Sequence, residues 1–232
     1  MKKLAGLNPG LKYRLALFAI LALSSIISIG MFAMRARSSE SFRYAFLVWN
    51  LFLAWVPFGF AWVAYTASQL PKFLRITFVG GSAILWLLFF PNAPYILTDF
   101  QHLAKLNSEA PVWYDVIMLI WFSWSGLFLG IISLYFMQKI MDRWFGKLAG
   151  WIFVVAVTIL SSLGIYAGRF LRWNSWDILL RPVKMTSRLI DNFSLTEERT
   201  LTFSFLFALF FLFVYVTIYL FAQLMNEKDS NN

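Results

Sequence analysis

Apolar residues dominate six stretches of the sequence, and each stretch is long enough to cross a bilayer as a helix. A transmembrane helix needs about 20 mostly apolar residues. The stretches that meet this requirement cover residues 15–33, 45–67, 73–90, 116–137, 149–166 and 201–225. We therefore expect an all-α, polytopic integral membrane protein, with residues 1–232 forming a single transmembrane domain. It would have six transmembrane helices and short interfacial helices on one face.

The composition agrees with this pattern and excludes several classes of protein. Hydrophobic residues make up 60% of the 232 residues and charged residues 13%, whereas soluble domains are about 45–50% apolar and 25% charged. The chain has no cysteine, which excludes disulfides, thiolate metal sites and cysteine nucleophiles. The net charge of +9 is expected to act on anionic lipid headgroups rather than on nucleic acid.

Basic residues leave the orientation in the membrane nearly undetermined. Cytoplasmic loops normally carry the excess of lysine and arginine, but each side of a six-span chain receives 10 basic residues here. The residues that flank the first span are Lys2, Lys3, Lys12 and Arg14 before it, and Arg35, Arg37 and Arg43 after it. This small excess before the span favours a cytoplasmic N-terminus, and with six spans the C-terminus lies on the same side.

The rare polar residues gather on one face of the membrane in either orientation. Successive spans cross the membrane in opposite directions. The ends of the odd-numbered spans and the starts of the even-numbered spans therefore lie on the same side. The polar residues on that side include Glu40, Arg43, Asn50, Asn92, Asp99, His102, Asp115, Arg169, Arg172, Asn174, Asp177 and Asp191. This set includes the only histidine of the chain, so the candidate chemistry is predicted on this face.

The segment FFPNAPYILTDFQH, residues 89–102, ends the third span with two prolines. Proline disfavours helix at the residue before it, and the carbonyls freed at that depth need partners, which the amide of Asn92 can supply. Farther along, apolar and polar residues fall on opposite helical faces, with Asp99 at the border between them. Residues 95–106 are therefore predicted to form a short amphipathic helix at the interface rather than part of a span. A second such helix is predicted over residues 177–188.

Asp99 and His102 lie three residues apart, so their side chains can touch on a helix. Three interpretations stay open: an ordered break in which Asp99 caps or pairs, a pair in which Asp99 orients His102 for proton transfer, and a metal site that adds Asp115 and Asp177. Asp115 opens the fourth span, where an acid suits the helix dipole, or it is functional if it faces inward. No cofactor is expected, and a divalent metal is the minor alternative.

The segment GRFLRWNSWDILLRP, residues 168–182, is the second dense polar stretch. Arg169 and Arg172 lie about one turn apart where the fifth span ends, and Asn174 and Asp177 follow. These residues are either snorkelling arginines in an interfacial tryptophan belt or a cradle for an anion. Two guanidiniums beside aromatic rings suit a lipid phosphate, a polyprenyl phosphate or a carboxylate. Together with Asn92, these four residues are the candidate binding residues.

Two glycine motifs predict close packing between helices. They are Gly126-x-x-x-Gly130 and Gly164-x-x-x-Gly168, whose small faces let helix backbones approach each other. Sequence motifs of known chemistry, such as a P-loop, HExxH, GxSxG or a dinucleotide fingerprint, are not present.

Four long strings carry a resemblance to a known family. They are WNLFLAWVP (49–57), LWLLFFPNAPYILTDFQHL (85–103), VWYDVIMLIWFSWSGLFLGIISLYFMQ (112–138) and GIYAGRFLRWNSWDIL (164–179). They resemble a bacterial family of predicted membrane proteins, domain of unknown function 1361, from about Arg43 to the sixth span. The resemblance implies a bacterial, multi-pass protein of the plasma membrane. It brings no activity, substrate or catalytic residue with it.

Three functional hypotheses follow from the polar face. The first is a membrane-embedded enzyme or binding protein for an amphiphile with an anionic headgroup. In it, Arg169 and Arg172 hold the head, and His102 moves a proton with Asp99 or Asp115. The second is a non-enzymatic scaffold or complex subunit, and the third is a transporter. The expected partners are the lipid bilayer and an anionic lipid or lipid-linked substrate, while the oligomeric state stays open.

Overall fold

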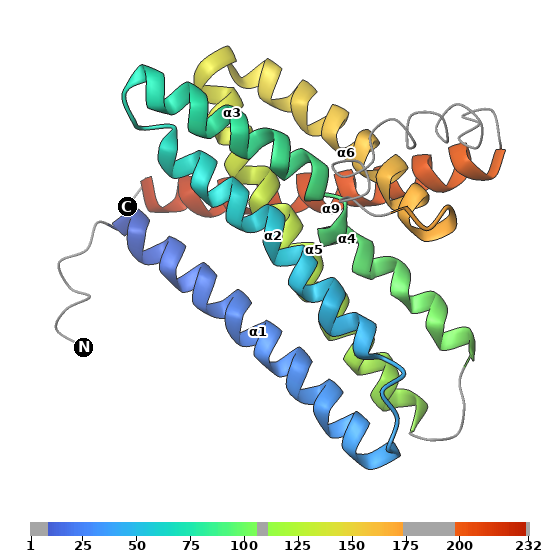
Figure 1. The fold of residues 1–232 in the computed structure, drawn as a ribbon. Coiled ribbons are helices and arrows are strands. Elements are labelled where there is room, and N and C mark those ends of the chain that lie inside the picture. Colours follow the sequence, from blue (N-terminus) through green and yellow to red (C-terminus); the bar gives the residue numbers. More distant parts are fainter. Residues whose placement is uncertain (1–8, 106–110, 174–197, 231–232) are drawn as a thin grey trace, which may run out of the picture. The chain divides into compact units, whose positions relative to one another are not determined.

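The computed structural model describes residues 9–105, 111–173 and 198–230, and these are helical with short connections (Figure 1). The helices are α1 (Pro9–Ser39), α2 (Ala45–Ala67), α3 (Lys72–Phe89), α4 (Asn92–Tyr95), the 3-10 helix η2 (Ile96–Lys105), α5 (Val112–Phe145), α6 (Lys147–Phe170) and α9 (Glu198–Ser230). Among these described residues, six helical segments are long and apolar enough to cross a membrane. The prediction of an all-α chain with six spans is confirmed.

Contacts between Cα atoms divide the chain into two compact units. Unit 1 comprises residues 1–55 and 93–130, and unit 2 comprises residues 56–92 and 131–232. Helices α2 and α5 each contribute residues to both units. The expectation of a single transmembrane domain stays a prediction.

Polar side chains join α1, α2 and α5 within unit 1. The hydroxyls of Ser24 and Ser125 lie 2.6 Å apart, and the indole of Trp55 donates to the Ser25 hydroxyl at 3.0 Å. The Tyr114 hydroxyl donates to the main-chain carbonyl of Met31 at 2.9 Å. Small hydroxyl residues let transmembrane helices approach closely and link them by hydrogen bonds, so these contacts hold together the parts of the three helices that belong to unit 1.

Aromatic rings fill the interior of unit 2. Trp86 of α3 packs against Phe90 at a centroid distance of 4.7 Å and against Phe153 of α6 at 5.8 Å. Phe211 of α9 meets Phe90 edge to face at 6.0 Å. The indole N–H of Trp86 donates to the Ser133 hydroxyl at 3.3 Å, which satisfies the one polar atom of a side chain that is only 1% exposed.

The helix breaks at the first of the two predicted prolines, Pro91, whereas Ala93 and Pro94 lie within the short helix α4. α3 ends at Phe89, and the chain resumes as the single turn of α4 before it narrows into the 3-10 helix η2. The side-chain amide of Asn92 donates to the Phe89 carbonyl at 3.0 Å, so it supplies the partner that the break requires. The predicted short helix at residues 95–106 is present, with a tighter winding than an α-helix. Its position at the membrane interface stays a prediction.

Gly126 of α5 lies directly on the segment that follows the break. A Cβ atom at this position would be 2.7 Å from the backbone oxygen of Ala93 and 2.9 Å from the Cδ1 of Ile96. In unit 2, a Cβ on Gly164 would lie 3.0 Å from a ring carbon of Pro91. Both glycines are therefore needed for the close approach of helices, and the predicted packing role is confirmed at these two positions.

Candidate functional site

The winding of η2 decides where Asp99 lies. Residues i and i+3 line up in a 3-10 helix, so Ile96, Asp99 and His102 form one row. Ile96 and Asp99 are both 0% exposed. The expectation that Asp99 lies at the border of the apolar face assumed α-helical spacing, and it is wrong for this reason. The amide of Asn50 from α2 donates to Asp99 Oδ2 at 2.9 Å, which stabilises the buried carboxyl group.

His102 stands at the outer end of the same row. Its Nε2 lies 4.0 Å from Asp99 Oδ1, and its side chain is 34% exposed. This distance is too long for a hydrogen bond, but it is short enough for the carboxylate to stabilise a protonated imidazole. The imidazole packs on the Phe46 ring at a centroid distance of 4.6 Å. His102 is thus a partly exposed imidazole that lies next to the buried carboxyl group of Asp99.

Asp115 is fully engaged with an arginine. Arg35 of α1 donates from Nε to Asp115 Oδ1 at 3.0 Å and from Nη2 to Oδ2 at 3.3 Å. Both side chains are buried, with exposures of 1% for Arg35 and 2% for Asp115. The remaining guanidinium nitrogen donates to the Ser39 hydroxyl at 3.1 Å. This bidentate geometry is the strong form of an ion pair, and it joins the end of α1 to the start of α5.

Tyr44 connects this ion pair to the histidine. The Arg35 guanidinium lies over the Tyr44 ring, 4.7 Å from its centroid, and Tyr44 and Phe46 lie 6.1 Å apart. Burial raises the pKa of the Tyr44 phenol, and the negative charge of Asp115 raises it further. The Tyr44 hydroxyl is buried and forms no hydrogen bond of good geometry among the described residues.

These contacts form a continuous cluster within unit 1, which we call the unit 1 cluster. Its members are Arg35, Tyr44, Phe46, Asn50, Asp99, His102 and Asp115. The structure thus links three sequence-predicted residues, Asp99, His102 and Asp115, through an arginine and two aromatic rings that the sequence did not single out.

Arg35 was counted only among the flanking cations of the first span. A sequence signal for it exists, because it lies beyond the apolar stretch but within helical reach of the membrane end. A cation there either reaches the membrane surface or pairs with an acid on a facing helix. Tyr44 and Phe46 carry no such signal, since aromatic residues make up 20% of the chain.

The two predicted arginines lie at the end of α6 in unit 2. Arg169 is in its last turn. Arg172 follows it with a backbone φ of 58°, a left-handed conformation that ends the helix and is uncommon outside glycine and asparagine. The N–H of Trp173 then donates to the Ala167 carbonyl at 3.2 Å, which helps satisfy the helix terminus.

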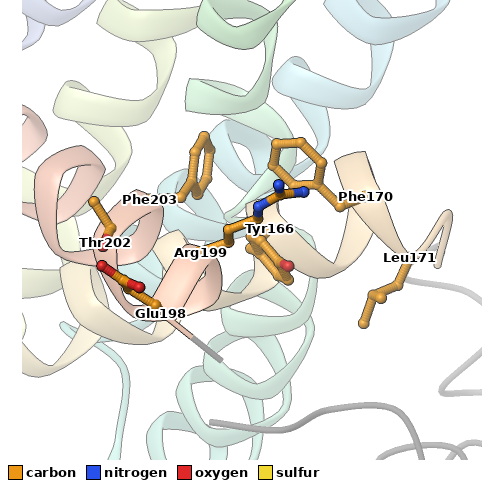
Figure 2. Close-up of a pocket in the computed structure, with 7 residues that line it drawn as sticks. All are labelled: Tyr166, Phe170, Leu171, Glu198, Arg199, Thr202 and Phe203. Carbon is orange, nitrogen blue, oxygen red and sulfur yellow. The ribbon is translucent and has the colours of Figure 1, made fainter. Parts of the chain in front are cut away.

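A pocket of about 810 Å³ lies between this end of α6 and the first turns of α9 (Figure 2). It is lined by Tyr166, Phe170, Leu171, Glu198, Arg199, Thr202 and Phe203. In Figure 2 the Arg199 side chain extends towards the rings of α6, and Glu198 extends the other way. The sequence did not single out these residues, because the helices that carry them are 28 residues apart in the chain at their nearest ends.

The remaining candidate binding residues lie either in unit 2 or in residues 174–197, which are outside the described part of the chain. Asn174 and Asp177 lie outside the described residues, as does the predicted helix at residues 177–188. Arg169 and Arg172 belong to unit 2, so their predicted convergence with the unit 1 residues stays a prediction. In the described part of the chain, no group of three or more histidine, aspartate or glutamate residues is placed to hold a metal ion.

Six apolar helices with polar clusters near their ends define an all-helical, multi-pass membrane protein. Residues 49–214 match the family described as "Protein of unknown function (DUF1361)", and the chain belongs to this family. The resemblance predicted from the sequence strings is confirmed. No curated protein and no solved structure gives a significant match.

Proposed function

We propose that this protein binds an amphiphile with an anionic headgroup, in the bacterial plasma membrane and with both termini in the cytoplasm. The observation that carries the proposal is the pocket between α6 and α9, which combines aromatic walls with an arginine. Ligand pockets in proteins are commonly about 300–1,000 Å³, mostly apolar, with a few polar groups that fix orientation. The volume and lining of this pocket meet that description.

Three rings form the apolar wall of the pocket. Phe170 and Phe203 meet edge to face at 5.3 Å, and Tyr166 lies 4.8 Å from Phe170 and 5.9 Å from Phe203. Rings held against one another provide a fixed apolar surface for the first carbons of a hydrocarbon chain. This wall supports an amphiphile rather than a wholly polar ligand.

The polar end of the pocket carries Arg199 and Glu198, and two further arginines lie nearby in the sequence. Arg199 presents a planar guanidinium, which pairs with phosphate or carboxylate through two parallel hydrogen bonds. It lies in the first turn of the 33-residue helix α9, where the positive end of the helix dipole also favours an anion. Arg169 and Arg172 flank the pocket residues Phe170 and Leu171 in the sequence and add further positive charge. An anionic headgroup is therefore the best-matched ligand.

We expect the substitution Arg199→Gln to weaken binding of an anionic lipid about tenfold or more. A hydrogen bond to a charged group contributes about 1.5–3 kcal/mol, and 1.4 kcal/mol corresponds to a factor of ten. The measurement is photo-crosslinking of a photoactivatable phosphatidic acid to the protein in phosphatidylcholine nanodiscs. The control is Arg75→Gln in the first turn of α3, which removes the same charge outside the pocket. Equal labelling of the two variants and the wild type contradicts the proposal.

A separate enzymatic hypothesis assigns proton transfer to His102 of the unit 1 cluster. We expect His102→Ala to leave the protein folded, because a partly exposed ring contributes only about 0.5–1.5 kcal/mol through its contact with Phe46. Thermal unfolding in detergent, followed by tryptophan fluorescence, measures this. If the variant instead loses expression and stability, His102 has a structural role.

A scaffold or complex subunit is the alternative, and one observation favours it. Asp115 and Arg35 use both carboxylate oxygens and all three guanidinium nitrogens within unit 1. Residues so completely engaged stabilise a structure and do not turn over a substrate. A transporter is the third candidate, and a water-filled path across the membrane would distinguish it from the other two.

A further inference from the structure

A second polar group is buried inside unit 2, and the proposed function does not use it. Gln138 and Asp142 lie one turn apart on α5, and Tyr215 of α9 donates its hydroxyl hydrogen to Gln138 Oε1. Gln138 is 0% exposed and Tyr215 is 1% exposed. The Asp142 side chain is 15% exposed, but its Oδ1 atom is buried. Buried polar atoms in a membrane helix are costly, so the partners of these atoms matter for stability.

Two atoms of this group lack partners. Gln138 Nε2 and Asp142 Oδ1 are both buried, and neither forms a hydrogen bond with any described residue. The other carboxylate oxygen of Asp142 lies 3.9 Å from the Lys139 ammonium. That ammonium also stands over the rings of Tyr135 at 5.1 Å and Tyr219 at 5.7 Å. The carboxylate therefore meets a cation through one oxygen, while its other oxygen is buried against the bundle.

Gly150 of α6 lies against the side chains of Asp142 and Gln138. A Cβ atom at Gly150 would collide with Asp142 Oδ1 and would lie 3.4 Å from the Cγ of Gln138. The backbone of α6 therefore lies against both side chains, and no larger residue fits beside them. The side chains that carry the unpartnered donor and acceptor therefore both lie against α6.

A single small molecule accounts for both unpartnered atoms. An unsatisfied buried polar group costs about 1–3 kcal/mol, and native proteins commonly fill such positions with water that makes two to four hydrogen bonds. The Cβ atoms of residues four apart on a helix are about 5–6 Å apart, and both side chains lie against Gly150. One molecule placed between them can therefore reach both.

The chemistry of the site favours water over a cation. The Gln138 amide presents a donor to the space while its oxygen accepts from Tyr215, and a donor repels a cation. Lys139 already supplies positive charge to Asp142. Water both donates and accepts. It would fit equally if the amide were turned over, because it can donate to two oxygens.

We propose that unit 2 holds one internal water molecule, which accepts a hydrogen bond from Gln138 Nε2 and donates one to Asp142 Oδ1. This water completes a polar link from Tyr215 of α9 through Gln138 to Asp142 on α5, at the point where Gly150 brings α6 against them. The site is separate from the lining of the α6–α9 pocket and does not rest on the proposed function.

The test is an NMR measurement of water contact at the Gln138 side-chain amide. The chain has four glutamines, so protein labelled with ¹⁵N at glutamine and held in nanodiscs gives few side-chain signals. Gln138→Leu assigns the relevant pair. We expect a cross-relaxation peak between these protons and water in the wild type and in Asp142→Asn, which keeps an acceptor oxygen, and its loss in Asp142→Leu.

A wild-type spectrum without that peak overturns the proposal, and so does a peak that persists unchanged in Asp142→Leu. If Asp142→Leu does not fold, the wild type and Asp142→Asn decide the question alone. Thermal unfolding in sodium-containing and sodium-free buffer is the second measurement. We expect no difference between the buffers, and a rise in unfolding temperature with sodium would assign the site to a cation instead.

Discussion

Replacement of Asp115 by leucine is expected to lower the free energy of unfolding by about 3–5 kcal/mol, the cost of breaking a buried ion pair by removing one partner. The substitution leaves the Arg35 guanidinium buried at 1% side-chain exposure without its carboxylate. Ser39 and the Tyr44 ring do not neutralise a charge. Unfolding of the purified protein in mixed micelles with increasing denaturing detergent, followed by tryptophan fluorescence, measures the loss.

Two variants separate charge from packing. The double substitution Arg35→Met with Asp115→Leu should recover most of the lost stability, because apolar residues of similar volume often replace a buried pair at little cost. Arg37→Met makes the same change at an exposed position two residues away and should stay within about 0.5 kcal/mol of the wild type. A double variant as unstable as Asp115→Leu would show that the stabilisation does not come from the pairing of charges.

Substitution of Gly126 by alanine is the second change with a large expected effect. The new Cβ would lie 2.7 Å from the Ala93 carbonyl oxygen, and that oxygen belongs to the backbone, so it cannot rotate away. Overpacking of this kind costs about 1–3 kcal/mol, and valine in the same position should cost more. The same detergent unfolding experiment measures the effect.

Gly30 provides the matched control for Gly126. It also lies within a helix of unit 1, but an added Cβ there meets no atom within 4 Å. Alanine at Gly30 should stabilise the protein slightly, since glycine inside a helix costs about 0.5–1 kcal/mol relative to alanine. The packing account is wrong if Gly126→Ala and Gly30→Ala unfold at the same detergent concentration.

The six spans were predictable because each depends on a local run of apolar residues. The break after the third span was predictable for the same reason, since proline acts on its immediate neighbours. The winding of η2 was not predictable, because the alternation of apolar and polar residues over ten positions fits more than one helical period. That difference decides the burial of Asp99. With α-helical spacing, Asp99 would lie at the edge of the apolar face. In the 3-10 helix it lies in the same row as Ile96, and both residues are buried.

The contacts between the residues of the candidate site were predictable from the sequence only in part. The alternation of spans places Arg35 and Asp115 on one membrane face, but nothing local pairs them, because 80 residues separate them. The link from Tyr44 through Phe46 to His102 depends on ring positions that only the packed helices fix. The pocket between α6 and α9 has the same origin, since its rings look like ordinary span residues in the sequence.

The long separation between Arg35 and Asp115 bears on how the protein is made. A ribosome adds about 5–20 residues per second, so roughly 4–16 s pass between the synthesis of Arg35 and that of Asp115. During this interval the first helix has emerged with its cation unneutralised. Arg35 therefore has to stay hydrated at the lipid surface or within the insertion machinery, because entry of an unpaired arginine into lipid costs several kcal/mol. We therefore expect the first span to reach its final depth only after the fourth has been synthesised, so that an early helix settles onto a later one while translation continues.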